Sequence, residues 1–390
     1  PSVQLGAPTF SVAESGTTLS VQLTRTGDLA GPSTVDYATS DTAGANNCNA
    51  VAGIASSRCD YLTTLGTLSF AAGEGSQTIS IPIIDDVYAE GTENFTITLS
   101  NAIGATLGSQ VSSTLTITDN ESVNGTSNPI DQAGFFVRQH YVDFLNREPD
   151  AAGLAFWTNQ ITECGTDAAC IELRRINVSA AFFLSIEFQE TGYLVYRTYK
   201  TAFGNLTNPA GAPVPVRFTD FLRDTQRTGH GFVVGVGDWQ AQLEANKQAY
   251  MLAFVQRTDF LAAYPNSLTG DQFVTQLDGH AGGVLSASEK ASLVSFLSGT
   301  PADVTKRASV LRSIAEDSNL VNAEKNRAFV LMQYFGYLRR NPFDPPEIGL
   351  NFDGYNFWLG KLNEFNGNFV NADMVKAFII STEYRKRFAP

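Results

Sequence analysis

The stretch SQTISIPIIDDVYAEGTENFTITLS, residues 76–100, decides the fold of the first third of this 390-residue chain. Apolar residues alternate with Thr, Ser or Asn on both sides of a short acidic turn, and a period of two is typical of half-buried β-strands. The alternating apolar positions are Ile79, Ile81, Phe95, Ile97 and Leu99. No apolar pattern with a helical period competes in this stretch. The sequence therefore predicts two strands separated by an acidic turn.

The same alternation continues outward from this stretch in both directions. Leu19, Val21 and Leu23 alternate with polar residues before it, and Leu115 and Ile117 do so after it. Gly, Asp and Asn separate these segments, so the pattern predicts an antiparallel β-sandwich of two sheets over residues 1–122. Residues 123–130 are rich in turn-forming Asn, Gly, Ser and Pro, and they are expected to form a linker.

Several further segments make the sandwich recognisable as a family. FSVAESG (10–16), LTRTGDLAG (23–31), VDYATSDTAG (35–44) and TLTITDN (114–120) occur in order around IIDDVYAEGTENF. Together they resemble a Calx-beta domain over residues 2–121, the immunoglobulin-like sandwich of sodium–calcium exchangers and of many bacterial surface proteins. In calcium-binding members of that family, acidic residues from several loops meet at one end of the sandwich.

The resemblance implies a set of calcium ligands in this chain. Carried over by position, the candidates are Glu14, Asp41, Asp85, Asp86, Glu90, Glu93 and Asp119. Ca²⁺ takes six to eight oxygen ligands from carboxylates and carbonyls, and clustered acids repel one another unless a cation joins them. Val87 and Asn120 replace further acids of the family, which is expected to lower the affinity. The alternative is a purely structural acidic cluster, in which Asp85 and Asp119 cap turns and Glu93 is solvated.

Charge is distributed unevenly along the chain. Residues 1–128 contain two basic and twelve acidic residues, whereas the remainder contains twenty-four basic and twenty-seven acidic residues. This asymmetry supports a domain boundary near residue 128. The net charge of −13 repels phosphate backbones and anionic membranes, so we expect no nucleic-acid partner. No apolar run is long enough to span a bilayer, so no membrane insertion is expected.

The four cysteines form two closely spaced pairs, Cys48 with Cys59 and Cys164 with Cys170. Their spacings match neither zinc-ribbon nor CxxC redox motifs, so local disulfides are predicted ahead of free buried thiols or a metal site. Disulfides indicate a secreted or cell-surface protein. Five Asn-x-Ser/Thr sequons are compatible with glycosylation in that setting. They begin at Asn94, Asn120, Asn124, Asn177 and Asn205.

After Pro129 the apolar period changes to 3.6, which predicts a mainly α-helical region over residues 131–390. FVRQHYVDFLNREPD, starting at Phe136, aligns without gaps with FVLMQYFGYLRRNPF, starting at Phe329. Each copy then reaches Gly-x-x-Phe-Trp and closes with Ser-x-Glu-aromatic. We predict three repeats, near residues 135–190, 195–262 and 323–388, of which the middle one has decayed. The motif residues are Tyr141, Arg147, Pro149, Asp150, Gly153, Trp157, Ser185 and Glu187, then Tyr334, Arg340, Pro342, Gly354, Trp358, Ser381 and Glu383.

This repeated unit resembles a helical domain of undetermined function from secreted bacterial proteins, distantly similar to phycobilisome linker domains. We interpret its motif as an architecture: a helix with Tyr141, a loop fixed by Arg147, and a second helix that begins after Asp150. Trp157, Trp239 and Trp358, one per repeat, are expected to be buried. The functional alternative is a ligand pocket lined by Arg147, Glu187 and Trp157.

Signatures of catalysis are missing from the sequence. His140, His230 and His280 form no HExxH motif, and neither a G-x-S-x-G elbow nor a phosphate-binding loop occurs. His140 is interpreted as a surface residue or a satisfied helix residue. We therefore expect a non-enzymatic extracellular structural or adhesive protein. The alternatives are a calcium-dependent glycan- or protein-binding module and, third, a hydrolase with an unrecognised site.

The expected partners are further copies of the chain or other surface proteins, with glycans as the alternative class. The first strand, PSVQLG, has no charged residue, so as an exposed sheet edge it would favour self-assembly into a filament or layer. Aromatic residues of the last repeat would supply the core of such an interface, unless they pack inside their own repeat. These aromatics are Phe335, Tyr337, Phe343 and Tyr355.

Overall fold

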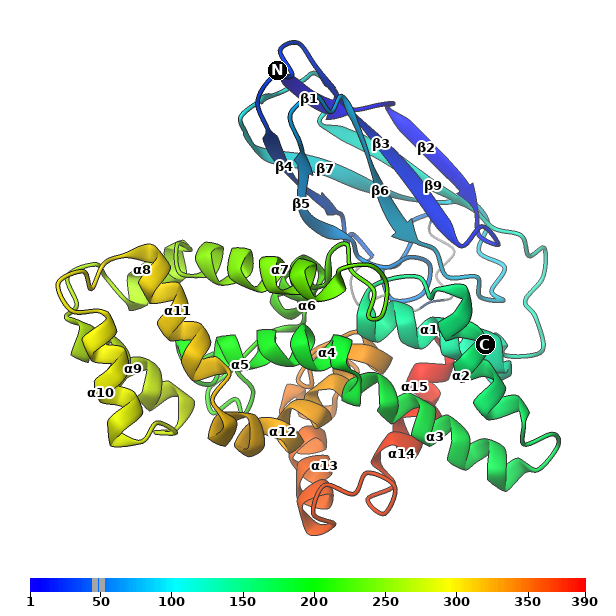
Figure 1. The fold of residues 1–390 in the computed structure, drawn as a ribbon. Coiled ribbons are helices and arrows are strands. Elements are labelled where there is room, and N and C mark those ends of the chain that lie inside the picture. Colours follow the sequence, from blue (N-terminus) through cyan, green and yellow to red (C-terminus); the bar gives the residue numbers. More distant parts are fainter. Residues whose placement is uncertain (44–47, 49–52) are drawn as a thin grey trace. The chain divides into compact units, whose positions relative to one another are not determined.

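The computed structural model describes residues 1–43, 48 and 53–390, and the chain divides into two compact units. The sandwich unit comprises residues 1–179 together with 376–390, and the helical unit comprises residues 180–375. Strands come first in the chain and helices follow, as Figure 1 shows. The predicted fold class, an immunoglobulin-like β-sandwich followed by an α-helical region, is confirmed.

The sandwich consists of a four-stranded and a five-stranded sheet. The first has the order β6-β3-β1-β8, formed by Ser76–Pro82, Thr18–Thr26, Ser2–Leu5 and Thr106–Leu107. The second has the order β2-β9-β7-β4-β5, formed by Thr9–Ala13, Ser112–Thr118, Glu93–Ile103, Ser33–Thr39 and Leu65–Phe70. Neighbouring strands are antiparallel except for two parallel pairs, β1 with β8 and β2 with β9.

The alternating sequence pattern produces the core between the two sheets. In β7, Phe95, Ile97 and Leu99 are buried while the polar residues between them are exposed, and in β3 Leu19 and Val21 are buried in the same way. Successive side chains of a strand point to opposite faces, so each strand contributes every second residue to the core. The apolar sides of both sheets form one continuous hydrophobic cluster.

The first strand is not the exposed sheet edge that the sequence suggested. β1 pairs with β3 on one side and with β8 on the other. The backbone N–H of Thr106 donates to the carbonyl oxygen of Pro1 at 3.0 Å, and that of Gly108 donates to Val3 at 2.8 Å. The chain returning from β7 therefore satisfies the backbone of β1, which removes the proposed sticky edge.

The helices of the sandwich unit come from both ends of the helical region. Its helical elements are η1 (Pro129–Asp131), α1 (Ala133–Leu145), α2 (Ala151–Thr162), the first part of α3 (Ala168–Leu184) and α15 (Thr382–Arg385). Asp150 caps α2, because its carboxylate accepts from the backbone N–H of Gly153 at 2.8 Å. The disulfide between Cys164 and Cys170, predicted from the spacing, closes the α2–α3 connection.

The helical unit packs α5 against α6, α9, α11 and α12. Its first elements are α4 (Ile186–Glu190), α5 (Gly192–Phe203), α6 (Phe218–Gly229), α7 (Trp239–Phe254), α8 (Thr258–Ala263) and α9 (Gly270–Ala281). They are followed by α10 (Ala287–Phe296), α11 (Val304–Ala315), α12 (Ser318–Gln333), the π-helical turn η2 (Tyr334–Leu338), η3 (Ile348–Leu350) and α13 (Asp353–Glu364). The helix α14 (Met374–Ile379) begins in this unit, and its residues from 376 onward belong to the sandwich unit. No helix among the described residues is long and apolar enough to cross a bilayer.

The first and last repeats share one local construction around a tyrosine and a glycine. α1 packs on α2, and α12 packs on α13. A Cβ atom on Gly153 would collide with the Tyr141 hydroxyl group, and a Cβ atom on Gly354 would lie 2.7 Å from the Tyr334 hydroxyl group. Glycine is therefore required in both copies, because the tyrosine of the first helix approaches the backbone of the second.

Other motif residues also occupy equivalent places in the two copies. The guanidinium of Arg147 lies 5.0 Å from the ring centre of Tyr141, and that of Arg340 lies 5.5 Å from Tyr334. Ser185 caps α4 and Ser381 caps α15, each accepting a backbone N–H at 3.1 Å. Pro149 is half-buried, Pro342 and Glu187 are buried, and Glu383 is half-buried.

The aromatic residues correct one expectation and decide between two alternatives. Trp157, Trp239 and Trp358 are half-buried rather than buried. Phe156 and Phe357, which precede two of them and contact their indole rings edge to face, are exposed, so these Phe–Trp pairs lie at the surface. The aromatics proposed for an interface instead pack inside their own unit. Phe335, Tyr337 and Tyr355 are buried, and Phe343 is half-buried.

Candidate metal centre

Strand ends bring acidic residues together at one end of the sandwich. β9 runs parallel to β2 and antiparallel to β7, so the ends of β2 and β9 lie beside the start of β7. β3 begins shortly after β2 ends and pairs antiparallel with β6, which places the end of β6 at this end as well. The acidic residues at these strand ends are Glu14, Asp85, Asp86, Glu90, Glu93, Asp119 and Glu121.

The carboxylates form two groups of three. One oxygen from each of Asp60, Asp86 and Glu90 lies within 4.8 Å of the other two, and we call these residues the Asp86 group. Glu14, Asp119 and Glu121 meet the same criterion and form the Glu14 group. The backbone N–H of Asp86 donates to Glu14 Oε1 at 3.1 Å, so the two groups adjoin.

Burial and mutual repulsion keep protons on these acids. Burial, and then the charges of neighbouring carboxylates, raise the pKa of Asp86 to about 11 and that of Glu90 to about 9. Burial likewise raises the pKa of Glu14 to about 8, although the Asp86 backbone N–H opposes this shift. For Glu93 the pKa rises to about 10, from burial and from its contact with Asp60. At neutral pH these carboxyl groups therefore hold protons, which a bound divalent cation would displace.

Several carboxylate oxygens of the cluster are buried without a hydrogen-bond partner. They are Asp60 Oδ1, Asp85 Oδ1, Asp86 Oδ2 and Glu121 Oε2. Asp60 and Asp86 are buried as whole residues, with exposures of 4% and 2%. Among the described residues, no arginine or lysine forms an ion pair with a member of either group. A buried carboxylate without a partner is costly, so these oxygens point to a missing positive charge.

Asp119 caps a turn and also belongs to the Glu14 group. Its Oδ2 accepts the backbone N–H groups of Glu90 and Gly91 at 2.7 Å each, and its Oδ1 accepts that of Glu121 at 2.6 Å. Burial alone would raise the pKa of Asp119, but these donors lower it below the usual value. Asp119 thus stays ionised, holds the turn that carries Glu90, and offers an oxygen to the Glu14 group.

The structure places the seven candidate ligands in three different situations. Glu14 and Asp119 belong to one group, and Asp86 and Glu90 belong to the other. Asp85 and Glu93 lie in the same end of the sandwich but in neither group. Asp41 is exposed, accepts a hydrogen bond from Ser57 Oγ at 2.6 Å, and is also in neither group.

Two members of the groups, Asp60 and Glu121, were not among the candidates from sequence. Asp60 follows Cys59 directly, and the predicted disulfide between Cys48 and Cys59 is present, with Cα atoms 5.6 Å apart. The disulfide packs on Tyr88 and brings Asp60 to the cluster. Glu121 lies two residues beyond Asp119, a spacing that returns to the same side of an extended chain.

The donor set fits a hard divalent cation. All the available ligands are oxygens from carboxylates on several flexible loops, and Ca²⁺ prefers six to eight such ligands at variable geometry. Neither group contains a histidine or cysteine ligand, which softer transition metals would favour. The unpartnered oxygens of Asp60 and Asp86 are thus the natural first ligands of the Asp86 group.

His140 has no features of a catalytic base. It is buried, with Nδ1 2.7 Å from the Phe136 carbonyl oxygen and Nε2 2.9 Å from Ser179 Oγ. Burial lowers its pKa to about 4, so the ring is neutral at physiological pH. It is the satisfied helix residue of our two interpretations, and not a surface residue.

Of the five sequon asparagines, four are exposed and one is half-buried. Asn94, Asn120, Asn124 and Asn177 are exposed. Asn205 is half-buried and accepts a hydrogen bond from Lys200 Nζ at 2.8 Å. Glycosylation at these positions remains a prediction.

Comparison with known families finds two matches, both within residues 1–192. Residues 1–121 match the Calx-beta domain, and residues 125–192 match a domain of unknown function, DUF4214. Both resemblances read from the sequence are thereby confirmed. No curated protein matches the chain.

Solved structures were also compared with this chain. The apo form of the Calx CBD1 domain is 29% identical with a TM-score of 0.27, and the match covers 30% of this chain and 96% of that chain. The calcium binding domain CBD12 of CALX1.1 is 29% identical with a TM-score of 0.27, covering 31% of this chain and 46% of that one. A two-domain protein of unknown function from Bacteroides fragilis is 17% identical with a TM-score of 0.22, covering 33% and 49%.

Proposed function

We propose that the sandwich is a calcium-binding module and that Ca²⁺ is held by the Asp86 group and the Glu14 group. The observation that carries this proposal is the set of buried carboxylate oxygens without partners, in Asp60 and Asp86 above all. The match of residues 1–121 to the Calx-beta family supports it. A divalent cation would supply the positive charge that no arginine or lysine of the described chain supplies to these groups.

Calorimetric titration and thermal melting test this proposal. A ligand that binds only the folded state stabilises it by about 2.7 kcal/mol when present at a hundredfold excess over its Kd. We expect Ca²⁺ to raise the melting temperature of the wild-type protein, and Asp86→Asn to remove most of that rise. The matched control is Asp28→Asn, because Asp28 is exposed and follows β3 at the opposite end of the sandwich. Absence of both heat and shift at millimolar Ca²⁺ contradicts the proposal.

We further propose that the whole chain is a non-enzymatic structural protein of the cell exterior. Two disulfides, Cys48–Cys59 and Cys164–Cys170, support an oxidising compartment. His140 is buried with both ring nitrogens hydrogen-bonded, so it offers no accessible general base. The recurring Tyr–Gly construction of the first and last repeats serves packing. The calcium module would then stabilise one part of a larger extracellular scaffold.

Self-association is the second candidate function, and one observation favours it. Phe156 and Phe357 occupy the same position in two repeats, and 55% and 56% of their respective surfaces are exposed. Exposed aromatics at interfaces contribute disproportionately to binding. We expect sedimentation velocity of the wild-type protein to show concentration-dependent large species that Phe156→Ser with Phe357→Ser abolishes. Equal behaviour of the two proteins would eliminate this surface, and a wild-type monomer at all concentrations would eliminate self-association.

A further inference from the structure

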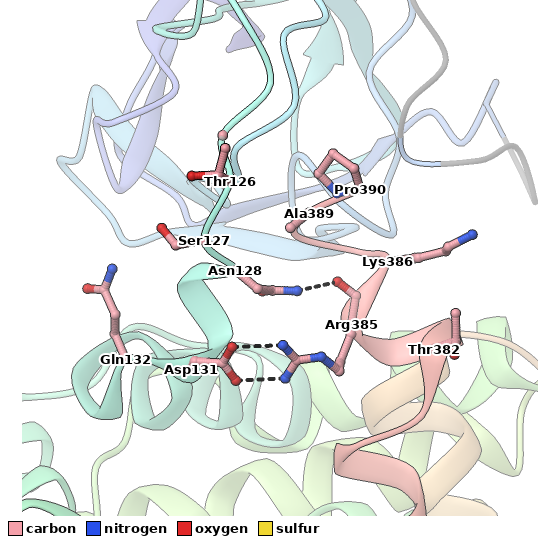
Figure 2. A pocket seen from close by; sticks show the side chains of 11 residues that line it. Thr126, Ser127, Asn128, Asp131, Gln132, Thr382, Arg385, Lys386, Ala389 and Pro390 are labelled. Carbon is pink, nitrogen blue, oxygen red and sulfur yellow. Dashed lines mark hydrogen bonds and ion pairs between the residues drawn. The ribbon is translucent and has the colours of Figure 1, made fainter. Parts of the chain in front are cut away.

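The last residues of the chain lie beside the candidate metal centre. We define the C-terminal segment as residues 381–390, in which Ser381 caps α15 and residues 386–390 continue in a turn. This segment belongs to the sandwich unit although residues 180–375 form the other unit. A cavity of about 800 Å³ is lined by residues of this segment and by residues 125–132. Figure 2 shows the two sets of lining residues facing each other.

The loop that carries the calcium ligands holds this segment directly. Val87 and Tyr88 lie between Asp86 and Glu90, two members of the Asp86 group. The backbone N–H of Val87 donates to the Phe388 carbonyl oxygen at 3.1 Å. The Tyr88 hydroxyl group donates toward the carbonyl oxygens of Lys386 at 3.0 Å and Ala389 at 2.6 Å.

A second contact involves the residue before the disulfide. Arg387 Nε donates to the carbonyl oxygen of Arg58 at 2.7 Å, and Arg58 Nη2 lies 3.4 Å from Glu383 Oε1. Arg58 precedes Cys59 and the ligand Asp60. Both chain stretches that supply the Asp86 group therefore also bind the C-terminal segment.

The opposite side of the segment is fixed to the first repeat. Arg387 forms a bidentate pair with Asp143 of α1, at 2.8 and 3.0 Å, and 1% and 2% of the two side chains are exposed. Arg385 pairs with Asp131 at 2.6 and 2.7 Å, and its carbonyl oxygen accepts from Asn128 Nδ2 at 2.9 Å (Figure 2). The C-terminal segment therefore contacts both α1 and the two chain stretches that supply the Asp86 group.

We propose that occupancy of the Asp86 group by Ca²⁺ locks the C-terminal segment onto the sandwich, so that the metal centre controls the attachment of the chain's last helical turn. This inference rests on the proposed calcium binding. Its partner is a segment of this same chain, recognised through the Tyr88 hydroxyl group and the backbones of Val87 and Arg58.

The cost of burying uncompensated carboxyl groups gives the coupling its direction. Without a cation, Asp86, Glu90 and Asp60 must lose solvation or take up protons to stay together in the fold, and this cost favours loop conformations that separate them. Val87 and Tyr88 lie between two of these ligands, so separating the ligands displaces the groups that bind the segment. A bound cation holds the ligands together and therefore favours the docked segment. Thermodynamic reciprocity requires that docking raises the calcium affinity by the same factor.

Tyr88→Phe isolates this coupling. The substitution removes both hydroxyl hydrogen bonds to the segment and leaves every carboxylate in place. Tyr37→Phe is the matched control, because Tyr37 lies on β4 and the Tyr37 ring faces Gly66 of β5, where an added Cβ atom would lie 3.1 Å from its hydroxyl group. The measurements on the full chain are hydrogen exchange of peptides covering residues 84–91 and 384–389, with and without Ca²⁺, and calorimetric Kd.

We expect Ca²⁺ to slow exchange about tenfold in both peptides of the wild-type protein. In the Tyr88→Phe protein, Ca²⁺ should still slow exchange in residues 84–91 but should slow it less in residues 384–389. The Kd for Ca²⁺ should rise about fivefold, because docking of the segment then contributes less to calcium affinity. Tyr37→Phe should match wild type.

The two peptides separate failure of this inference from failure of calcium binding. Protection of residues 84–91 alone would overturn the coupling and leave the calcium site intact. No change in either peptide would overturn both. A Tyr88→Phe protein that matches wild type in Kd and in protection of residues 384–389 would also overturn the coupling.

Discussion

Asp86 is a buried residue whose polar groups form only some of the hydrogen bonds available to them. Its Oδ1 accepts the backbone N–H of Tyr88 at 2.7 Å, its own N–H donates to Glu14, and its Oδ2 is buried without a partner. The backbone N–H and Oδ1 thus hold the loop by hydrogen bonds, whereas Oδ2 has no hydrogen-bond partner. A side chain whose only role was to cap the turn would not need its second oxygen in a buried position.

The raised pKa values predict how stability depends on pH in the calcium-free protein. The folded state raises the pKa of Glu14 from 4.5 to about 8 and that of Asp86 from 3.8 to about 11. Their stabilising contribution is therefore fully present below about pH 4 and is lost as the pH rises through the folded values. We expect the melting temperature of metal-free protein to fall between pH 5 and pH 8.

Calcium should reverse this trend, because ionised carboxylates bind it and release their protons. Thermal melts of metal-free and calcium-loaded protein at pH 5 to 8 test the prediction. Titrations in two buffers of different ionisation enthalpy measure the protons released. A metal-free melting temperature that is constant or rises over this range would show that the cluster is ionised and solvated in the folded protein.

Among the structural elements, the disulfide loop has a direct connection to the metal centre. Cys59 precedes Asp60, and the Cys48–Cys59 disulfide packs on Tyr88, so the cross-link positions both a ligand and the docking tyrosine. Removing a cross-link restores conformational freedom to the loop that it closed.

Replacing Cys48 and Cys59 by Ser should therefore weaken calcium binding about tenfold, which corresponds to about 1.4 kcal/mol. The matched control replaces Cys164 and Cys170 by Ser, because that disulfide lies in the α2–α3 connection. Calorimetric Kd values of the two variants provide the comparison. Equal Kd values would mean that the Cys48–Cys59 link does not position Asp60.

The tyrosine–glycine contact between paired helices makes a prediction within the last repeat. Gly→Ala in a helix is normally stabilising by up to about 1 kcal/mol. Gly354→Ala should instead destabilise by about 1–3 kcal/mol, because the new methyl group would lie 2.7 Å from the Tyr334 hydroxyl group. Gly360→Ala in the same helix meets no atom within 4 Å and should be neutral or stabilising.

Denaturant unfolding measures these differences, and a double variant identifies their cause. Tyr334→Phe removes the clashing oxygen, so Gly354→Ala combined with it should recover much of the loss. Additive effects of the two substitutions would locate the strain elsewhere, for example at Glu347 Oε1, 3.0 Å from the same position.

Elements marked by a pattern in neighbouring residues could be predicted from the sequence. Contacts between residues far apart in the chain could not. Alternation in β3 and β7 and the two disulfide spacings identified the sandwich and its cross-links. The parallel pairing of β2 with β9 has no local signature, because register is set by distant strands. Asp60 was missed because its place depends on the disulfide and on the hydrogen bond of its carbonyl oxygen with the backbone N–H of Ile84, and the latter contact has no local signature. The pairing of Arg387 with Asp143 joins residues 244 positions apart, a separation at which no spacing rule applies.

At the scale of the whole molecule, the chain carries one unit inserted within another. Residues 180–375 form the helical unit, and the sandwich unit is completed by residues on both sides of this insertion. The candidate metal centre lies entirely in the sandwich unit. Ca²⁺ should therefore act on the stability of that unit.

Differential scanning calorimetry should show two transitions, of which Ca²⁺ raises one and leaves the other unchanged. Asp86→Asn should abolish the shift of the sensitive transition. A destabilising variant in the helical unit, Gly354→Ala, should lower only the insensitive transition. A single transition that Ca²⁺ shifts as a whole would show that the two units unfold together.

Because residues 376–390 complete the sandwich unit, the order in which the chain is synthesised affects when that unit can finish folding. A chain made from its amino end produces the strands and α1 first, with Asp143 still lacking Arg387 and Tyr88 lacking its carbonyl acceptors. The helices between these parts must all be synthesised before residues 376–390 can take their places in the sandwich unit. Folding of the earliest-made unit therefore cannot be completed until residues 376–390 have been made, so a chain terminated before residue 376 would leave its first-made part unfinished and open to proteolytic clearance.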